Sequence, residues 1–194
     1  MFRENSNMCQ SDTEVLGLSL SSADYHSVQM KGDIIDRIHY ADGRVEERVG
    51  HNIVVNSFLN LVMCLLKQQS GYTGIQYWAV GSGADSWDNA TPDPNITDTR
   101  LVSEIGRVEI PTSEISFLDA ELNPTSTPTN IIQITHTFGP NDCNGKWREF
   151  GIFGGNASAS ANSGIMINHR HHPILTKTNE MTVERVMRFT LTLV

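Results

Sequence analysis

The feature that most constrains this chain is a two-residue alternation in residues 183–193. The apolar side chains there stand at odd-numbered positions, namely Val183, Met187, Phe189, Leu191 and Leu193. Alternate side chains of a β-strand point to opposite faces of a sheet, so the pattern predicts a strand with one face on a core. Residues 131–138 repeat it, because Ile132, Ile134, His136 and Phe138 would share one face. Such segments predict a mainly β protein.

Two dipeptides predict tight turns between strands. Asp42-Gly43 follows the strand-like segment 33–40, and Asn144-Gly145 precedes the strand-like segment 147–153. These residue types tolerate the positive φ angles that a two-residue hairpin requires. We therefore expect a β-hairpin at each place.

One helix is expected after the first hairpin. Apolar residues recur at three- and four-residue steps from Val55 to Leu66, which is the period of an α-helix. Asn52 is the expected N-cap, and Gly71 is expected to stop the helix. The wide apolar stripe predicts a helix that is packed on more than one side.

The whole pattern, seven or eight strands and one helix, best fits an antiparallel β-sandwich with one packed α-helix. Residues 84–98 and 123–129 are rich in Pro, Asp and Asn and are expected to be loops. Residues 1–30 are polar and aperiodic, and we interpret them as an N-terminal arm that becomes ordered against a partner. Residues 31–194 would then form the structural domain.

The charge of the chain argues against two classes of partner. The chain of 194 residues has 22 acidic and 14 basic side chains and a net charge of −8. Binding to nucleic acid or to an anionic membrane needs clustered Lys and Arg, so we expect neither. Residues 1–10 lack the apolar core of a signal peptide, and the apolar region 54–66 is shorter than the roughly 20 residues of a spanning helix. We therefore expect no membrane insertion.

The sequence contains none of three motifs of nucleotide-binding and catalytic sites, namely G-x-x-x-x-G-K-[ST], H-E-x-x-H and G-x-S-x-G. Gly81-x-Gly83 has Ser86 where a dinucleotide-binding motif has its third glycine, so a backbone turn is the favoured interpretation. Glu46 and Glu47 would point to opposite faces of a strand and could not act as an acid–base pair. We expect no enzymatic activity, no catalytic residues and no cofactor.

His169 and His171 are the strongest candidates for a metal site. On a strand they would share one face, about 7 Å apart. Two imidazoles fall short of the four ligands of structural zinc, although a symmetric trimer could bring six together. A polar strand end is the favoured interpretation, no metal site is assigned, and metal binding by this pair stays open. His136 is expected to be a hydrogen-bonded core histidine.

Tryptophan side chains could provide a platform for a sugar ring. Trp78 and Trp147 lie in apolar strand segments and are expected in the core. Trp87 lies in the loop 84–98 and is therefore the candidate contact for a glycan.

Three stretches, in this order, resemble one family. The first is Asp42-Gly43 followed by His51-Asn52-Ile53-Val54-Val55 and the helix. The second is Ala79-Val80-Gly81-Ser82-Gly83, then Thr97-Asp98-Thr99-Arg100-Leu101 and Glu104-Ile105-Gly106-Arg107. The third is Arg148-Glu149-Phe150-Gly151-Ile152-Phe153, then Gly164-Ile165-Met166, Pro173-Ile174, Lys177-Thr178 and the closing strand. Their order, across residues 31–194, resembles structural proteins of tailed bacteriophages, of the tail-fibre, collar and baseplate-attachment type, and components of contractile injection systems. The resemblance implies a β-rich, oligomeric building block without catalytic residues.

We therefore expect a virion structural protein of a phage tail, assembled in the host cytoplasm. It would form a homo-oligomer, a trimer or hexamer, and dock on other tail or fibre proteins. The region of Glu104 and Arg107 and the strand Trp147-Arg148-Glu149-Phe150 could both pair charges at a seam between sheets or subunits, and the alternative is an intramolecular surface salt bridge. The alternative is a receptor- or glycan-binding module of a tail fibre, with Trp87 contacting a host-surface glycan.

Overall fold

The computed structural model describes residues 28–193, which form ten β-strands and one α-helix. In chain order the elements are β1 (Val28–Tyr40), β2 (Val45–Val54), α1 (Ser57–Leu66), β3 (Thr73–Gly81), β4 (Glu104–Glu109), β5 (Ile115–Leu118), β6 (Pro124–Thr125), β7 (Ile131–Phe138), β8 (Gly145–Gly155), β9 (Ile165–Lys177) and β10 (Met181–Leu193). Two short 3₁₀ turns, η2 (Asp85–Asp88) and η3 (Thr112–Glu114), lie in the connections. Over this range, no helix has the length and apolar character needed to cross a membrane.

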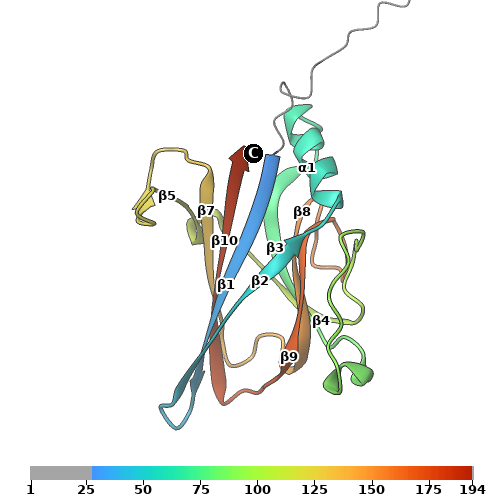
Figure 1. The fold of residues 1–194 in the computed structure, drawn as a ribbon. Helices are drawn as coiled ribbons and strands as arrows, with labels where there is room; N and C mark the ends of the chain where they lie inside the picture. The colour runs from blue at the N-terminus through green and yellow to red at the C-terminus, as the bar shows by residue number, and fades with distance from the viewer. Residues whose placement is uncertain (1–27, 194) are drawn as a thin grey trace, which may run out of the picture.

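All ten strands belong to one antiparallel sheet, which curls into a half-barrel (Figure 1). The strand order is β4-β3-β8-β9-β2-β1-β10-β7-β5-β6. Strand β2 joins the two halves of the sheet. It pairs with β1 along most of its length, and with β9 only through Ile53 and Val54.

The prediction of a mainly β, antiparallel protein with one helix is confirmed. The structure differs from the predicted sandwich in that the facing layers are two halves of one continuous sheet, because β2 passes from one half to the other. The predicted arm, residues 1–30, overlaps β1, which begins at Val28. The remainder of that segment lies outside the described residues.

The core fills the inside of the half-barrel with the inward-facing residues of both halves. The alternation predicted in β10 is confirmed for Val183, Met187 and Phe189, which are all buried. On the neighbouring strand β1, Ile34 and Ile38 are buried in the same way, and each lies directly opposite its β10 partner in the register. From the other half of the sheet, β3 and β8 contribute large side chains to this core: Trp78, Val80, Trp147, Phe150 and Ile152.

Helix α1 begins four residues later than the sequence predicts. Asn52, the predicted N-cap, lies in β2, and Asn56 occupies the N-cap position. Pairing with β1 extends the strand this far, because Gly32 lies opposite Asn52 and has no side chain to displace its amide. The helix ends at Leu66, ahead of the predicted stop at Gly71.

The predicted hairpin at Asp42-Gly43 is confirmed, and the one at Asn144-Gly145 is wrong. Strands β1 and β2 pair around Gly43, which has a φ of 84°. Strands β7 and β8, by contrast, are not neighbours in the sheet, because β8 pairs with β3 and β9. The segment 139–144 instead crosses between the two halves, where the rings of Phe138 and Trp147 pack with their centroids 4.9 Å apart.

A long loop, residues 82–103, covers the outer surface of β3, β8 and β9 (green, beside β4 and β9 in Figure 1). Its two ends meet where the N–H of Ser82 donates to the carbonyl of Ser103 at 2.8 Å. A second, smaller apolar cluster lies on this outer side: Val55, Ala79, Leu101, Phe153 and Met166. Strand β8 is consequently buried on both faces. The core of the half-barrel covers its inner face, and the long loop with the second cluster covers its outer face.

Candidate functional site

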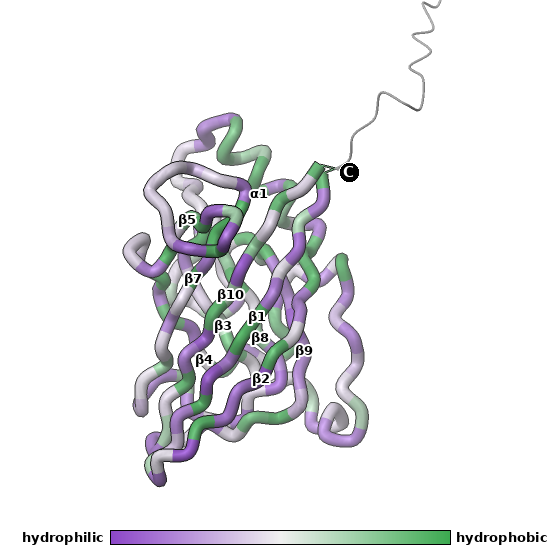
Figure 2. Tube along the Cα trace, turned by 60° about the vertical axis from the view of Figure 1, so that its left-hand side comes forward, coloured by the Kyte–Doolittle hydropathy of each residue, from purple (hydrophilic) through white to green (hydrophobic). Residues whose placement is uncertain are grey.

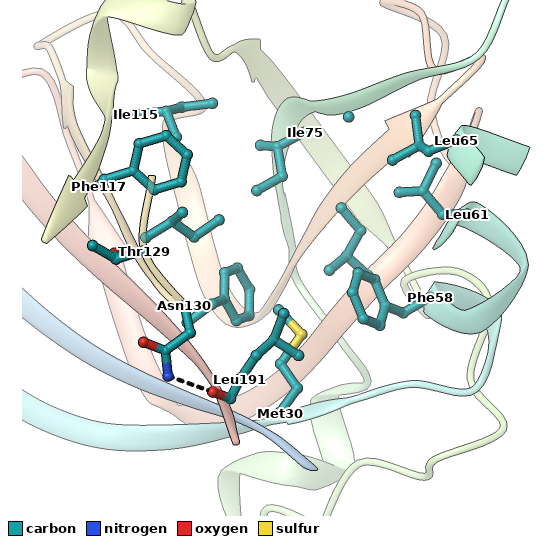
Figure 3. Close-up of a pocket in the computed structure, with 14 residues that line it drawn as sticks. Met30, Phe58, Leu61, Leu65, Ile75, Ile115, Phe117, Thr129, Asn130 and Leu191 are labelled. Atoms are coloured by element: carbon teal, nitrogen blue, oxygen red, sulfur yellow. Dashed lines mark hydrogen bonds between the residues drawn. The ribbon is translucent and has the colours of Figure 1, made fainter. Parts of the chain in front are cut away.

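One end of the half-barrel contains an apolar cavity of about 390 Å³. It lies between α1 and β5, at the end where β1 begins and β10 finishes (Figure 3). Helix α1 contributes Phe58, Leu61 and Leu65, which face Ile115 and Phe117 of β5 across the cavity. Further lining side chains come from the sheet and its connections: Met30, Ile75, Thr129, Asn130, Ile132, Ile167, Phe189 and Leu191.

The two polar side chains of this cavity are engaged with the protein backbone. The amide nitrogen of Asn130 donates to the carbonyl of Leu191 at 2.6 Å, drawn as a dashed line in Figure 3. The hydroxyl of Thr129 donates to the carbonyl of Leu118 at 2.7 Å. The cavity therefore presents mostly hydrocarbon to anything that enters it.

The outer face of α1 is apolar as well and remains exposed. Leu59, Met63 and Leu66 follow one another at helical spacing, and their exposed fractions are 63%, 64% and 72%. Near the helix, Val28 of β1 lies opposite Leu193 of β10, and both side chains are exposed. Figure 2 shows hydrophobic, green stretches of the tube at this end of the molecule, near α1 and the C-terminus. We use the name apolar end for the surface formed by the cavity, by Leu59, Met63 and Leu66 of α1, and by Val28 and Leu193.

A second region, on the outer side of the sheet, brings together the two histidines that the sequence singled out. His169 and His171 share one face of β9, as predicted, and their ring centroids lie 4.5 Å apart. They lie mid-strand, away from the strand end that the sequence favoured. Asp98 of the long loop and Glu149 of β8 complete what we call the histidine cluster, with His169 between the two carboxylates.

Glu149 is fully buried and acts only as an acceptor. Its carboxylate accepts hydrogen bonds from the backbone N–H groups of Gly83, Val102 and Ser103, at 2.9–3.1 Å, and lies 3.0 Å from Nε2 of His169. Burial acts to raise the pKa of this carboxyl, but the hydrogen bonds from His169, Ser103 and Val102 outweigh it, so the pKa lies below its ordinary value. An ionised Glu149 thus fastens both ends of the long loop to the sheet.

Arg148 fastens the same loop at a second point. Its guanidinium is bidentate on Asp88, at 2.7 and 2.8 Å, and also donates to the carbonyl of Ser82. The charged residues of this strand therefore pair within the chain, Arg148 with Asp88 and Glu149 with His169. Glu104 and Arg107 do pair with each other, at 2.6 Å, in a buried intramolecular salt bridge.

The predicted positions of the three tryptophans, two in the core and Trp87 in the loop, are confirmed. Trp78 and Trp147 are fully buried in the core. Trp87 lies in η2, and its ring stacks on His171 with 4.1 Å between centroids and an angle of 37°. One face of Trp87 is thus engaged within the chain, and its role as a glycan contact stays a prediction.

His136 and Gly83 also match their predicted roles. Nδ1 of His136 lies 2.8 Å from the carboxylate of Glu114, so this histidine is hydrogen-bonded at the margin of the core. Gly83 has a φ of 56° and begins the long loop directly after β3. These observations agree with a turn at Gly81-x-Gly83.

Sequence reasoning missed the buried ion pair between Asp36 and Arg185. Both side chains point into the half-barrel, where Arg185 is fully buried and Asp36 is 6% exposed. The signal was present, because each charge interrupts an alternating apolar face: Asp36 lies between Ile34 and Ile38, and Arg185 lies between Val183 and Met187. Two such interruptions on the inner faces of neighbouring strands predict a buried pair.

No protein-family model matches this chain, and no curated protein matches it.

Proposed function

We propose that this protein is a structural subunit of a phage tail, belonging to the fibre, collar or baseplate-attachment parts, and that it acts through oligomerisation and docking. The order of motifs across residues 31–194 supports the class of protein. The apolar end supports the mode of action and is the observation that carries the proposal. Contiguous exposed apolar surface of this kind marks interaction sites in soluble proteins.

The apolar end combines a ridge and a groove on one molecule. The ridge is the outer face of α1, with Leu59, Met63 and Leu66, and the groove is the adjacent cavity. When the ridge of one copy enters the groove of the next, the contact is heterologous, and such contacts close into rings when the rotation between copies permits. A trimer or a hexamer is the expected outcome.

Burial of the exposed apolar side chains would favour such an assembly. Fully burying one Leu or Met side chain contributes roughly 1.5–3 kcal/mol. Three ridge residues, together with Val28 and Leu193, would each add a contribution of that order at every interface. The remaining docking partners would be other tail or fibre proteins, and the assembled subunit would be part of the virion.

The experiment measures the mass of the purified chain by light scattering and sedimentation velocity over a wide concentration range. We expect a trimer or hexamer for the natural sequence. The variant Leu59→Glu/Met63→Glu/Leu66→Glu should be monomeric and keep the circular dichroism spectrum of the folded chain, because all three side chains are exposed in the single chain.

A matched control is available at the opposite end of the half-barrel. Val45 and Val49 of β2 are also apolar and exposed, at 55% and 66%, but lie outside the apolar end. Val45→Glu/Val49→Glu should keep the oligomer. A natural chain that stays monomeric at high concentration and is missing from purified particles would contradict the proposal.

A further inference from the structure

The histidine cluster has the arrangement of atoms that a divalent metal ion requires. Asp98, His169 and His171 each offer one ligand atom, and these three atoms lie within 4.8 Å of one another. Ligands that share one zinc ion at 2.0–2.2 Å lie roughly 3–3.5 Å apart, so closing the site needs movements of about an ångström. His169 is buried, and the Asp98 side chain is 30% exposed, which leaves a route for the ion from solvent.

In a neutral His169 ring, the hydrogen bond from Nε2 leaves Nδ1 as the nitrogen that can coordinate a metal ion. Its Nε2 lies 3.0 Å from Glu149, a carboxylate that already accepts three backbone N–H groups and has no proton to donate. Nε2 must therefore be the protonated donor nitrogen. In the neutral ring the lone pair is then on Nδ1, which lies 2.7 Å from Oδ2 of Asp98. A nitrogen lone pair and a carboxylate oxygen at this distance repel each other unless a cation or a proton lies with them.

His171 shows the same organisation around its other nitrogen. Its Nδ1 lies 2.8 Å from the carbonyl oxygen of Pro92, which accepts only, so Nδ1 carries the proton. The lone pair is on Nε2, which is buried and has no hydrogen-bond partner among residues 28–193. A buried acceptor without a partner is costly and calls for a ligand. The stacked ring of Trp87 holds this imidazole in place.

Both histidines thus have the outer hydrogen bonds typical of metal ligands. Ligating histidines donate their second N–H to a carboxylate or a backbone carbonyl, which fixes the tautomer and the ring orientation. Glu149 does this for His169, and Pro92 does it for His171. Two imidazoles and one carboxylate suit a first-row divalent ion, with water in the remaining coordination positions.

We propose that Asp98, His169 and His171 bind one divalent transition-metal ion, with Zn²⁺ as the probe, and that the ion clamps the long loop to strand β9. The inference is independent of the proposed function, since neither the apolar end nor oligomerisation enters it. A bound ion would join residue 98 of the loop to residues 169 and 171 of the sheet, beside the Glu149 anchor and in addition to it.

The test uses the untagged full chain, stripped with a chelator and titrated with ZnCl₂ by calorimetry. We expect one high-affinity ion per chain, a rise in melting temperature on binding, and a zinc-edge X-ray absorption spectrum with nitrogen and oxygen ligands only. The absorption spectrum separates this site from zinc held by a cysteine thiolate, which gives a sulfur shell at about 2.3 Å.

Three variants decide the outcome. His171→Gln and Asp98→Asn each remove a ligand and should weaken zinc binding by more than the roughly 10–100-fold that loss of an outer hydrogen-bond partner costs. Asp98→Asn keeps an oxygen that can accept from the N–H of Asn95, so it retains the loop contact and the fold. His51→Gln is the matched control, because His51 forms an equally short pair with Asp33 at 2.7 Å but is exposed. It should bind zinc like the natural chain.

Absence of stoichiometric zinc binding by the natural chain would overturn the proposal. So would binding that survives both His171→Gln and Asp98→Asn, or a sulfur shell in the absorption spectrum. A chain that oligomerises but binds no zinc would leave the proposed function intact, and a monomer that binds zinc would leave this inference intact.

Discussion

Arg185 on β10 donates two hydrogen bonds to Asp36, directly opposite on β1, with Nε–Oδ1 and Nη2–Oδ2 distances of 2.6 and 2.7 Å. The pair is buried inside the half-barrel. The guanidinium also lies over aromatic rings of the opposite half, 4.1 Å from the ring centroid of Phe150 and 5.4 Å from that of Trp147. This residue therefore connects the two halves of the curled sheet through the core.

Removing one member of this pair should be strongly destabilising. Arg185→Met leaves the Asp36 carboxylate buried without its partner, and loss of one partner of a buried pair costs about 3–5 kcal/mol. Urea unfolding followed by tryptophan fluorescence measures the change. The matched control is Arg37→Met on β1, next to Asp36 in sequence, whose pairs with Glu47 and Glu184 are partly exposed. It should change stability by about 0–1 kcal/mol.

The double variant Asp36→Leu/Arg185→Met should recover much of the stability that the single variant loses. Replacing a whole buried pair with hydrophobic residues of similar size is often neutral. If the double variant were no more stable than Arg185→Met, the pair would not be the source of the loss.

The same pair predicts how stability depends on pH. Burial acts to raise the pKa of Asp36, but attraction and hydrogen bonding from Arg185, with smaller contributions from His172 and Arg170, hold it below the ordinary value of 3.8. Because the folded state has the lower pKa, the stabilising contribution of Asp36 is complete above about pH 4 and is lost as pH falls toward the folded pKa.

We expect the urea midpoint of the natural protein to fall between pH 4 and pH 2 more steeply than that of Asp36→Leu/Arg185→Met. The comparison is made at constant ionic strength, so that screening of surface charges is the same in both proteins. Parallel curves for the two proteins would exclude Asp36 as a source of the acid sensitivity.

Glu149 should determine how firmly the long loop is held. Glu149→Gln replaces one acceptor oxygen with a donor that faces backbone N–H groups, so at least one buried group loses its partner. Arg100 lies exposed in this loop. We expect trypsin to cleave after Arg100 at least about tenfold faster in the variant, since cleavage follows the population of the open loop. Mass spectrometry in chelator-containing buffer measures the rate.

The control for the loop experiment is Glu109→Gln, which changes an exposed carboxylate on β4. Its cleavage rate should equal that of the natural protein. An unchanged rate in Glu149→Gln would show that other contacts, such as those of Arg148, hold the loop by themselves.

Gly154 and Gly74 should respond differently to the same substitution. A Cβ on Gly154 of β8 would collide with the backbone carbonyl of Gly74 on β3 and press on Leu61, whereas a Cβ on Gly74 would meet nothing within 4 Å. Overpacking of this kind costs about 1–3 kcal/mol. Gly154→Ala should therefore lower the urea midpoint, and Gly74→Ala should leave it nearly unchanged; equal effects would contradict this packing.

Cys143 should be an unreactive thiol in the folded protein. Burial, with a contribution from the nearby Asp142 carboxylate, raises the pKa of this thiol to about 11. The thiolate is the reactive form, so at pH 8 roughly one molecule in a thousand is reactive, which predicts alkylation slowed on the order of 100-fold relative to an ordinary cysteine. Alkylation of Cys9→Ser/Cys64→Ser by iodoacetamide, with and without urea, measures this. Similar rates in both conditions would contradict it.

Strand type and strand position could be read from the sequence wherever side chains alternate. Residues 131–138 and 183–193 were predicted with bounds close to those of β7 and β10, because their alternation reports one buried face. The shared face of His169 and His171 followed from the same period of two. Asp42-Gly43 predicted its hairpin correctly, since the turn and both strands are local in the chain.

Which strands pair, and which distant side chains meet, was decided by the tertiary structure. Asn144-Gly145 has the local chemistry of a hairpin turn, yet packing of Trp147 against Phe138 across the core sends β8 to the other half of the sheet. Asp98 and Glu149 are 71 and 20 residues from His169 in sequence, and only the loop laid over β9 brings all three together. Local propensity acts over a few residues, whereas these contacts depend on how the sheet curls and on which buried groups must find partners.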